Sequence, residues 1–165
     1  MRMGRGGSEG EKCAFCDTSR ENYTDPLDNV LQMWYTYTIV MDNKSCVIYK
    51  GEKFTIEWYY DKNGKSAAQD FFYETTEDLQ DKFFILIKRM AEFGKIFDKT
   101  KFRNEGDGIY AFKPQPDRFL SFFTDNKKII ITNGFRKKTD KLPLNEKKLA
   151  IDYKRDYFDR KSEGK

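Results

Sequence analysis

Three short β-prone segments, separated by only a few polar residues, restrict the fold of this chain more than any other feature. They span residues 108–113, 118–123 and 128–132. The two connections contain Pro, Asp and Asn, and both are too short for the crossover that parallel strands require. The segments therefore predict an antiparallel three-stranded meander.

Helical patterns flank this meander on both sides in the sequence. From Glu77 to Phe93 apolar residues recur every three or four positions, as in an amphipathic helix that packs on a core, and Gly94 is expected to end it. The members of this apolar stripe are Leu79, Phe83, Leu86, Met90 and Phe93. A second amphipathic helix, with a basic outer face, is predicted at residues 145–158.

A strand at residues 54–60 and a short helix precede the long helix. An Asn-Gly turn follows the strand, and Ser66 is placed as the N-cap of a helix that extends to Glu74. The predicted order is strand, helix, helix, three strands, helix. This order describes an α+β domain with a small antiparallel sheet (β-α-α-β-β-β-α).

Residues 1–50 differ in composition from this domain. The first 28 residues are rich in Gly, Ser, Arg and Glu and are predicted to be disordered. Residues 34–49 contain two β-prone runs around a turn-forming cluster, which indicates a β-hairpin. Alternatively, everything before about residue 49 lies outside the functional unit. We therefore divide the chain into a partly disordered extension (1–50) and one domain (53–161).

The length and the hydropathy pattern indicate a soluble protein. A chain of 165 residues can form one hydrophobic core but is too short for two ordinary domains. No apolar run approaches the roughly 18 to 20 residues that a membrane-spanning helix needs, and the first residues do not resemble a secretory signal. We expect a cytoplasmic protein without membrane contact.

The cysteines suggest neither a disulfide nor a complete metal site. Cys13 and Cys16 have the spacing of half a zinc site, but the only further cysteine is Cys46 and the chain contains no histidine. A reducing cytoplasm would also keep the three thiols free. Incidental cysteines are the preferred interpretation, with zinc binding as the alternative, and we expect neither a metal nor another cofactor.

The positive charge is concentrated in the C-terminal part of the chain. Residues 1–52 contain six Lys and Arg against eight Asp and Glu, whereas residues 134–165 contain eleven against six. Such a local excess favours contact with a nucleic-acid backbone through counterion release. The alternative interpretation is a solvated helix face, because mixtures of Lys and Glu are common on protein surfaces.

Four motifs occur in a fixed order along the predicted domain. They lie at residues 60–66, 90–94, 108–118 and 133–143. Their order and separations resemble the HigB-like, phage-derived branch of the RelE/ParE superfamily of toxin–antitoxin toxins. The last motif is the most specific, because it combines a glycine, an aromatic residue, a basic cluster, a threonine and a lysine before a proline.

The resemblance implies both a fold and an activity. It implies a RelE-like sheet with helices on one face and an open, basic, concave surface on the other, which docks in the ribosomal A site. The implied activity is that of a metal-independent endoribonuclease, an mRNA interferase that cleaves message on the ribosome and blocks translation. The implied partners are the ribosome, mRNA and a cognate antitoxin, with which the toxin would form a heterotetramer.

This reaction, attack by the ribose 2′-OH on the neighbouring phosphate, needs a proton acceptor, cations and a proton donor. Without histidine, crowded positive charges would have to lower a lysine pKa enough for it to act as the base. The resemblance implies catalytic roles for Arg118 at the scissile phosphate, for Arg136 late in the last strand, and for Lys113, where the family more often has arginine. The residues expected to bind RNA and the ribosome are Lys137, Lys138, Lys141, Lys147 and Lys148.

Each role has a structural alternative. Arg118 is alternatively a sheet-edge arginine paired with Asp117 or Asp125, and Lys113 a strand-end lysine in water. For Arg136 a functional role is the preferred interpretation, and a structural role is the alternative.

Two departures from the RelE pattern leave the activity open. The tyrosine that stacks on a base in RelE falls near Leu142 here, so stacking would need Tyr110, Phe135 or Tyr153, for which core positions are preferred. Basic residues of RelE's second strand also align with apolar positions in this chain. The alternative functions are a ParE-like inhibitor of DNA gyrase and a catalytically inactive RelE-fold binding module.

Overall fold

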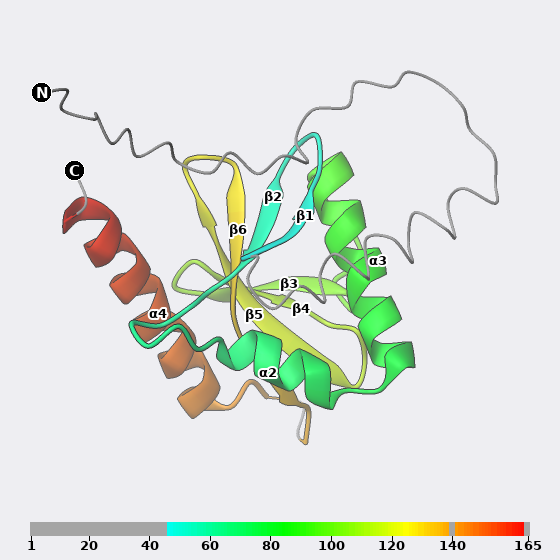
Figure 1. Ribbon diagram of the computed structural model, residues 1–165. Helices are drawn as coiled ribbons and strands as arrows, with labels where there is room; N and C mark the ends of the chain where they lie inside the picture. The colour runs from blue at the N-terminus through cyan, green and yellow to red at the C-terminus, as the bar shows by residue number, and fades with distance from the viewer. Residues whose placement is uncertain (1–45, 139–140, 164–165) are drawn as a thin grey trace, which may run out of the picture. The chain divides into compact units, whose positions relative to one another are not determined.

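The computed structural model describes residues 46–138 and 141–163, which form a six-stranded mixed sheet and three helices (Figure 1). The strands are β1 (Val47–Lys50), β2 (Thr55–Trp58), β3 (Phe102–Gly106), β4 (Ile109–Phe112), β5 (Asp117–Thr124) and β6 (Lys128–Arg136). The helices are α2 (Ala67–Glu74), α3 (Glu77–Phe93) and α4 (Leu144–Glu163). The segment predicted to be disordered and the first strand of the expected hairpin lie outside the described residues.

The strands lie in the order β1-β2-β6-β5-β4-β3. The meander of β4, β5 and β6 is antiparallel, which confirms the prediction. The prediction of a wholly antiparallel sheet is wrong, because β2 pairs with β6 in parallel. The connection between β2 and β6 contains α2, α3 and the strands β3, β4 and β5, so it is long enough for the crossover that a parallel pair requires.

The sheet has an edge strand on each side, β1 and β3, that the predicted domain did not include. β1 corresponds to the second half of the expected hairpin, but its partner among the described residues is β2. Within the described part of the chain the sheet thus begins at Val47, a few residues before the expected start of the domain. At the opposite edge, β3 was not predicted, because its sequence Phe102–Gly106 is polar and half exposed and lacks an apolar alternation.

The predicted helices are present, and their ends follow the expected chemistry. The Ser66 side chain accepts a hydrogen bond from the Gln69 amide at 3.3 Å, which confirms the N-cap of α2. Gly94 ends α3 in the left-handed region with a φ of 73°. Phe93 is 69 % exposed, so its inclusion in the apolar stripe is wrong; α3 ends there and the chain turns away. None of the described helices combines the length and apolar character needed to cross a bilayer.

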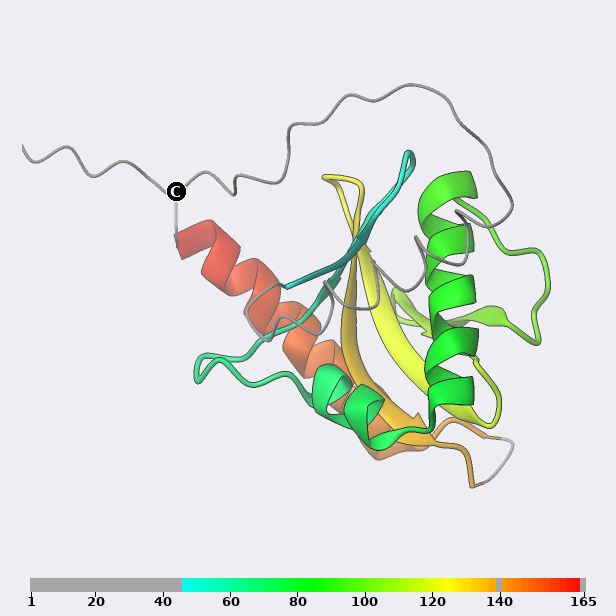
Figure 2. The ribbon, with the colours of Figure 1, turned by 45° about the vertical axis from the view of Figure 1, so that its right-hand side comes forward.

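The first core lies between the sheet and the helices α2 and α3 (Figure 2). At its centre Phe83 of α3 is fully buried, with its ring 4.2 Å from that of Phe119 and 5.7 Å from that of Trp58. Phe72 of α2 completes this aromatic group. The spacing of apolar residues along α3 therefore places one aromatic ring among rings from both the sheet and α2.

The second core lies on the other face of the sheet, beneath α4. Leu120 and Phe122 of β5 pack there with Ile130 of β6 and with Ala150 of α4. Since β5 and β6 carry apolar side chains on both faces, each face needs a cover. The prediction of helices on one face is therefore wrong, and α4 covers part of the surface that the resemblance implied to be open.

An irregularity between β5 and β6 changes the side-chain alternation near the end of β6. The register shifts between Leu120 and Ser121, opposite Asn133 and Ile131. The extra residue in β6 forms a β-bulge. Ile131, before the bulge, faces the α2/α3 core, whereas Phe135, four residues later, faces the α4 core. The Asn133 amide nitrogen donates to Glu146 Oε2 at 2.8 Å and so ties the bulge to the first turn of α4.

A polar contact also holds α4 against Tyr59, the residue that follows β2, and it predicts a pH effect. The Tyr59 hydroxyl and Arg160 both bond Asp156 Oδ2, at 2.5 and 2.6 Å, and the Tyr59 bond in particular lowers the pKa of Asp156. A lowered carboxyl pKa stabilises the fold above the unfolded-state value, roughly pH 4, and this contribution is lost as the pH falls. We expect Asp156→Asn to cost about 1 kcal/mol at pH 6 and less at pH 3 in urea unfolding.

A nearby carboxylate provides the control for this experiment. Asp152 is half exposed and lies 3.9 Å from Arg155. Asp152→Asn should leave the free energy of unfolding nearly unchanged at both pH values. An Asp156→Asn effect of the same size at pH 3 as at pH 6 would contradict the assignment.

Candidate nucleic-acid site

A pocket of about 410 Å³ lies at the end of the sheet where the turn between β4 and β5 meets the end of β6. It receives side chains from the loop before β3, from β3, from the β4–β5 turn, from the start of β5 and from the residue after β6. The lining residues are Lys99, Thr100, Arg103, Lys113, Gln115, Pro116, Asp117, Arg118 and Lys137. Five of these nine side chains are cationic, so the pocket is suited to an anion.

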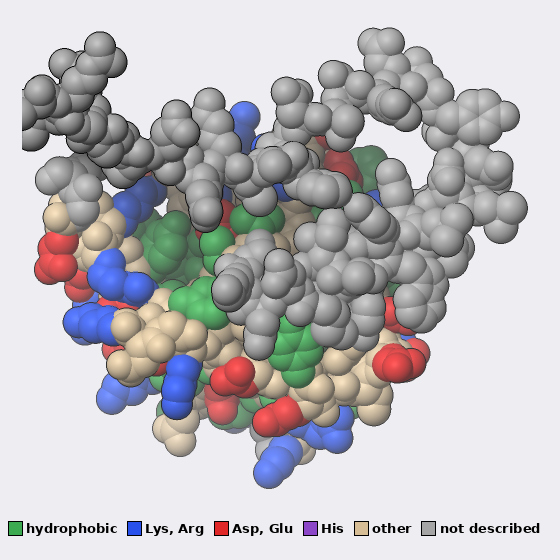
Figure 3. Space-filling model, in the orientation of Figure 1, with side chains coloured by type: hydrophobic (Ala, Val, Ile, Leu, Met, Phe, Trp, Pro, Cys, Tyr) green, Lys and Arg blue, Asp and Glu red, His purple; other side chains and the backbone are tan. Residues whose placement is uncertain are grey.

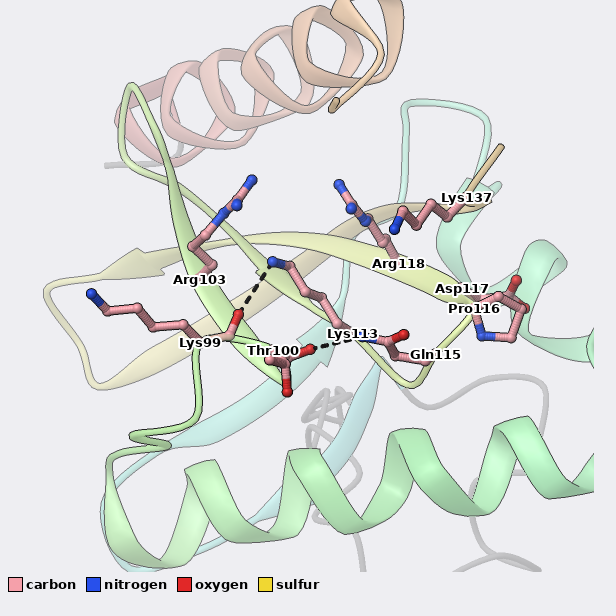
Figure 4. A pocket seen from close by; sticks show the side chains of 9 residues that line it. All are labelled: Lys99, Thr100, Arg103, Lys113, Gln115, Pro116, Asp117, Arg118 and Lys137. Atoms are coloured by element: carbon pink, nitrogen blue, oxygen red, sulfur yellow. Dashed lines mark hydrogen bonds between the residues drawn. The ribbon is translucent and has the colours of Figure 1, made fainter. Parts of the chain in front are cut away.

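Arg118 is positioned in this pocket by the alternation of β5. Leu120 and Phe122 belong to the α4 core, and the period of two along a strand places Arg118 on the same face. Only 5 % of Arg118 is exposed. Figure 4 shows its guanidinium beside the Lys137 side chain, which the shifted alternation of β6 brings to this face.

Lys113 is buried beside Arg118, so the alternative of a strand-end lysine in water is wrong. The residue is 6 % exposed, and its ammonium donates to the Lys99 carbonyl at 3.3 Å (Figure 4). Burial lowers the pKa of Lys113, and the positive charges of Arg103 and Arg118 lower it further, whereas the charge of Glu105 opposes the change. The crowding of positive charges that a lysine base would need is therefore present at Lys113.

Two further residues of the site come from the unpredicted strand β3. The Arg103 guanidinium binds the Glu105 carboxylate through two hydrogen bonds, of 3.1 and 2.8 Å, and Glu105 lies 3.7 Å from the Lys113 ammonium. The sequence signal for this pair is weak, because it consists only of opposite charges two residues apart, which share one side of a strand.

Arg136, by contrast, does not line the pocket. Its Nε donates to Asp117 Oδ1 at 3.1 Å, and its side chain is 59 % exposed. Asp117 is fully buried, and its second carboxylate oxygen has no hydrogen-bond partner among the residues that the structure describes. The structure thus brings Lys113, Arg118 and Lys137 together in the pocket. Arg136 instead forms an ion pair with Asp117, the residue before Arg118.

The remaining predicted binding lysines lie outside the pocket. Lys138, Lys141 and Lys148 are exposed, and Lys147 forms an ion pair of 2.6 Å with Asp107 in the β3–β4 turn. Figure 3 shows Lys and Arg side chains interspersed with Asp and Glu along α4. A mixed surface of this kind also fits the alternative of a solvated helix face.

The candidate stacking aromatics are packed against other rings. Phe135 is 8 % exposed and belongs to the α4 core. Tyr153 stacks on Tyr59 at 4.5 Å, and Tyr110 stacks on Phe102 at 5.7 Å. The prediction of a core position is therefore confirmed for Phe135, whereas Tyr153 is partly buried at the edge of the α4 core and Tyr110 is half-buried outside both core clusters.

The described residues contain no group of His, Cys, Asp and Glu that could hold a metal ion. Cys46 is a free, exposed thiol, and Cys13 and Cys16 lie outside the described part of the chain. Two guanidinium groups, those of Arg103 and Arg118, line the pocket, and a guanidinium is a planar group that can bind two oxygens of a carboxylate or phosphate.

The family described as phage derived protein Gp49-like (DUF891) matches residues 70–155, slightly more than half of the chain. The chain belongs to this family. The Gp49-like domain is part of the RelE/ParE-like toxin superfamily, and the matched range includes every residue of the pocket. A search of curated proteins found no match.

Proposed function

We propose that this Gp49-like protein is the toxin of a toxin–antitoxin pair and that it cleaves mRNA on the ribosome. The observation that carries the proposal is the buried Lys113, which lies between two arginines in a cationic pocket. Such a lysine can lose its proton more readily than an ordinary surface lysine. The family membership supports the same class of function.

The reaction is a transfer of the phosphate from the 5′ oxygen to the 2′ oxygen. Neutral Lys113 accepts the proton of the 2′-OH as this oxygen bonds to phosphorus. Arg118 and Arg103 stabilise the negative charge on the phosphorane oxygens. The bond from phosphorus to the 5′ oxygen then breaks, and Lys137 donates the proton that the leaving oxygen takes up. The products are a 2′,3′-cyclic phosphate and a 5′-hydroxyl.

Partners follow from the same proposal. The ribosome would hold the message so that one phosphate enters the pocket. Such positioning of the reacting groups can supply a large part of the rate enhancement. The exposed Lys138, Lys141 and Lys148 would contact ribosomal RNA. A neighbouring antitoxin would suppress activity by covering the pocket.

Primer extension on a defined mRNA in a reconstituted translation system tests the proposal. The purified chain should produce new 5′ ends with ribosomes and none without them. Arg118→Ala should lower the cleavage rate by about 10- to 100-fold, because a charge-assisted bond to the phosphate is lost. Arg155→Ala is the matched control, since Arg155 is 70 % exposed on α4, and it should cleave as the wild type does.

Three outcomes would contradict the proposal. Equal cleavage without ribosomes excludes ribosome dependence, and undiminished cleavage by Arg118→Ala excludes this pocket. Intact message under all conditions, together with loss of supercoiling by purified gyrase, would instead support a ParE-like inhibitor.

A further inference from the structure

Glu105 connects two cations that line the pocket. Its carboxylate accepts both hydrogen bonds from Arg103, at 3.1 and 2.8 Å, and the same Oε1 that accepts the longer one lies 3.7 Å from the Lys113 ammonium. Arg103 and Lys113 line the pocket, whereas Glu105 is not among its lining residues. The carboxylate therefore contacts the site through its cations.

The burial of this carboxylate is unusual for an edge strand. The Glu105 side chain is only 5 % exposed, while the Arg103 side chain is 45 % exposed. A buried carboxylate is costly unless cations and hydrogen bonds surround it. Because Glu105 has both, the three side chains depend on one another for their positions.

We propose that Glu105 is a positioning residue of the pocket, which holds Arg103 and Lys113 in place for the reaction. The inference deepens the proposed function and rests on it for its catalytic meaning. With two guanidinium nitrogens fixed by the carboxylate, the remaining N–H groups of Arg103 are left for the phosphate. Figure 4 shows Arg103 and Arg118 directed to the same side of the sheet, with the Lys113 ammonium between them.

Glu105 also acts on the proton of Lys113. Burial lowers the pKa of Lys113 most, the charges of Arg103 and Arg118 lower it further, and the charge of Glu105 raises it. The other charged groups that line the pocket are Lys99 before β3, Asp117 of β5 and Lys137 after β6. Removing the charge of Glu105 should therefore make Lys113 lose its proton at lower pH, and removing that of Arg103 should have the opposite effect.

Competitive acetylation of the intact chain measures the pH at which Lys113 loses its proton, and it needs no RNA. Mass spectrometry follows the acetylation of each lysine across a pH series. In Glu105→Gln the pH at which Lys113 becomes reactive should shift down. In Arg103→Gln it should shift up, and in Glu105→Asp it should return toward the wild-type value. Lys128, which pairs with Glu57 at 2.7 Å, serves as the internal control and should not shift.

Opposite shifts in the two variants support the inference, because general disturbance of the fold would move both in one direction. Coincident midpoints in wild type, Glu105→Gln and Arg103→Gln would overturn it. If Glu105→Gln does not fold, Arg103→Gln decides alone: an upward shift supports the inference and an unchanged midpoint overturns it.

The pH dependence of mRNA cleavage separates this inference from the proposed function. If both hold, the acid limb of the rate profile moves down in Glu105→Gln, together with the acetylation midpoint. Acetylation shifts without any cleavage by the wild type would refute the nuclease and retain Glu105 as the positioning residue of an anion pocket. Cleavage with unshifted midpoints would retain the nuclease and refute the role of Glu105.

Discussion

Replacing Lys113 by methionine should lower the rate of mRNA cleavage by about 10²- to 10⁴-fold, the usual contribution of a general base. The methionine fills the same buried space, so the loss is expected in the chemical step. Single-turnover cleavage of message on stalled ribosomes measures this step directly. The acid limb of the pH–rate profile should disappear with the side chain.

Lys113→Arg distinguishes a base from a cation. Arginine keeps the positive charge but does not lose its proton at neutral pH. If Lys113 accepts the 2′-OH proton, Lys113→Arg should be as slow as Lys113→Met. Recovery of most of the activity in Lys113→Arg would show that the residue acts through its charge alone, and the base would have to be sought elsewhere.

Phe83→Ala should destabilise the fold by about 3–5 kcal/mol, as is typical for an aromatic side chain removed from a core. Phe83 is fully buried, and its ring lies within 6.5 Å of the rings of Trp58, Phe72, Phe112 and Phe119. The cavity would open between α3 and the sheet, where α2 also packs. Urea unfolding followed by far-UV circular dichroism gives the change in free energy.

Phe93→Ala is the matched control on the same helix. Both residues belong to the apolar stripe expected from the sequence, but Phe93 is 69 % exposed. Its replacement should change the free energy of unfolding by less than about 0.5 kcal/mol. Comparable losses from the two variants would contradict the assignment of the core.

The predictable parts of the fold are those with a strong local pattern. The helix from Glu77 to Phe93 has the bounds that its apolar spacing and Gly94 indicate. The meander follows from apolar runs and short turns. The parallel pairing of β2 with β6 could not be predicted, because it depends on which residues meet across the whole domain and not on any local signal.

The candidate site was predictable to a similar degree. Strand alternation was enough to place Arg118 on the face of Leu120. Arg136 and Lys137 were harder to distinguish, since the bulge at Asn133 determines which of two adjacent cations reaches the pocket. Glu105 was not predicted, because the polar sequence of β3 did not indicate a strand. A single acidic residue also does not indicate a site until the cations around it are known.

The position of β6 between β2 and β5 has a consequence for protein synthesis. β2 is synthesised before its parallel partner β6, with two helices and three strands between them in the sequence, and contacts between such distant segments form slowly. Lys137, which follows β6, completes the pocket. A nascent chain therefore has no finished anion site until Lys137 has been synthesised and β6 has paired with its neighbours.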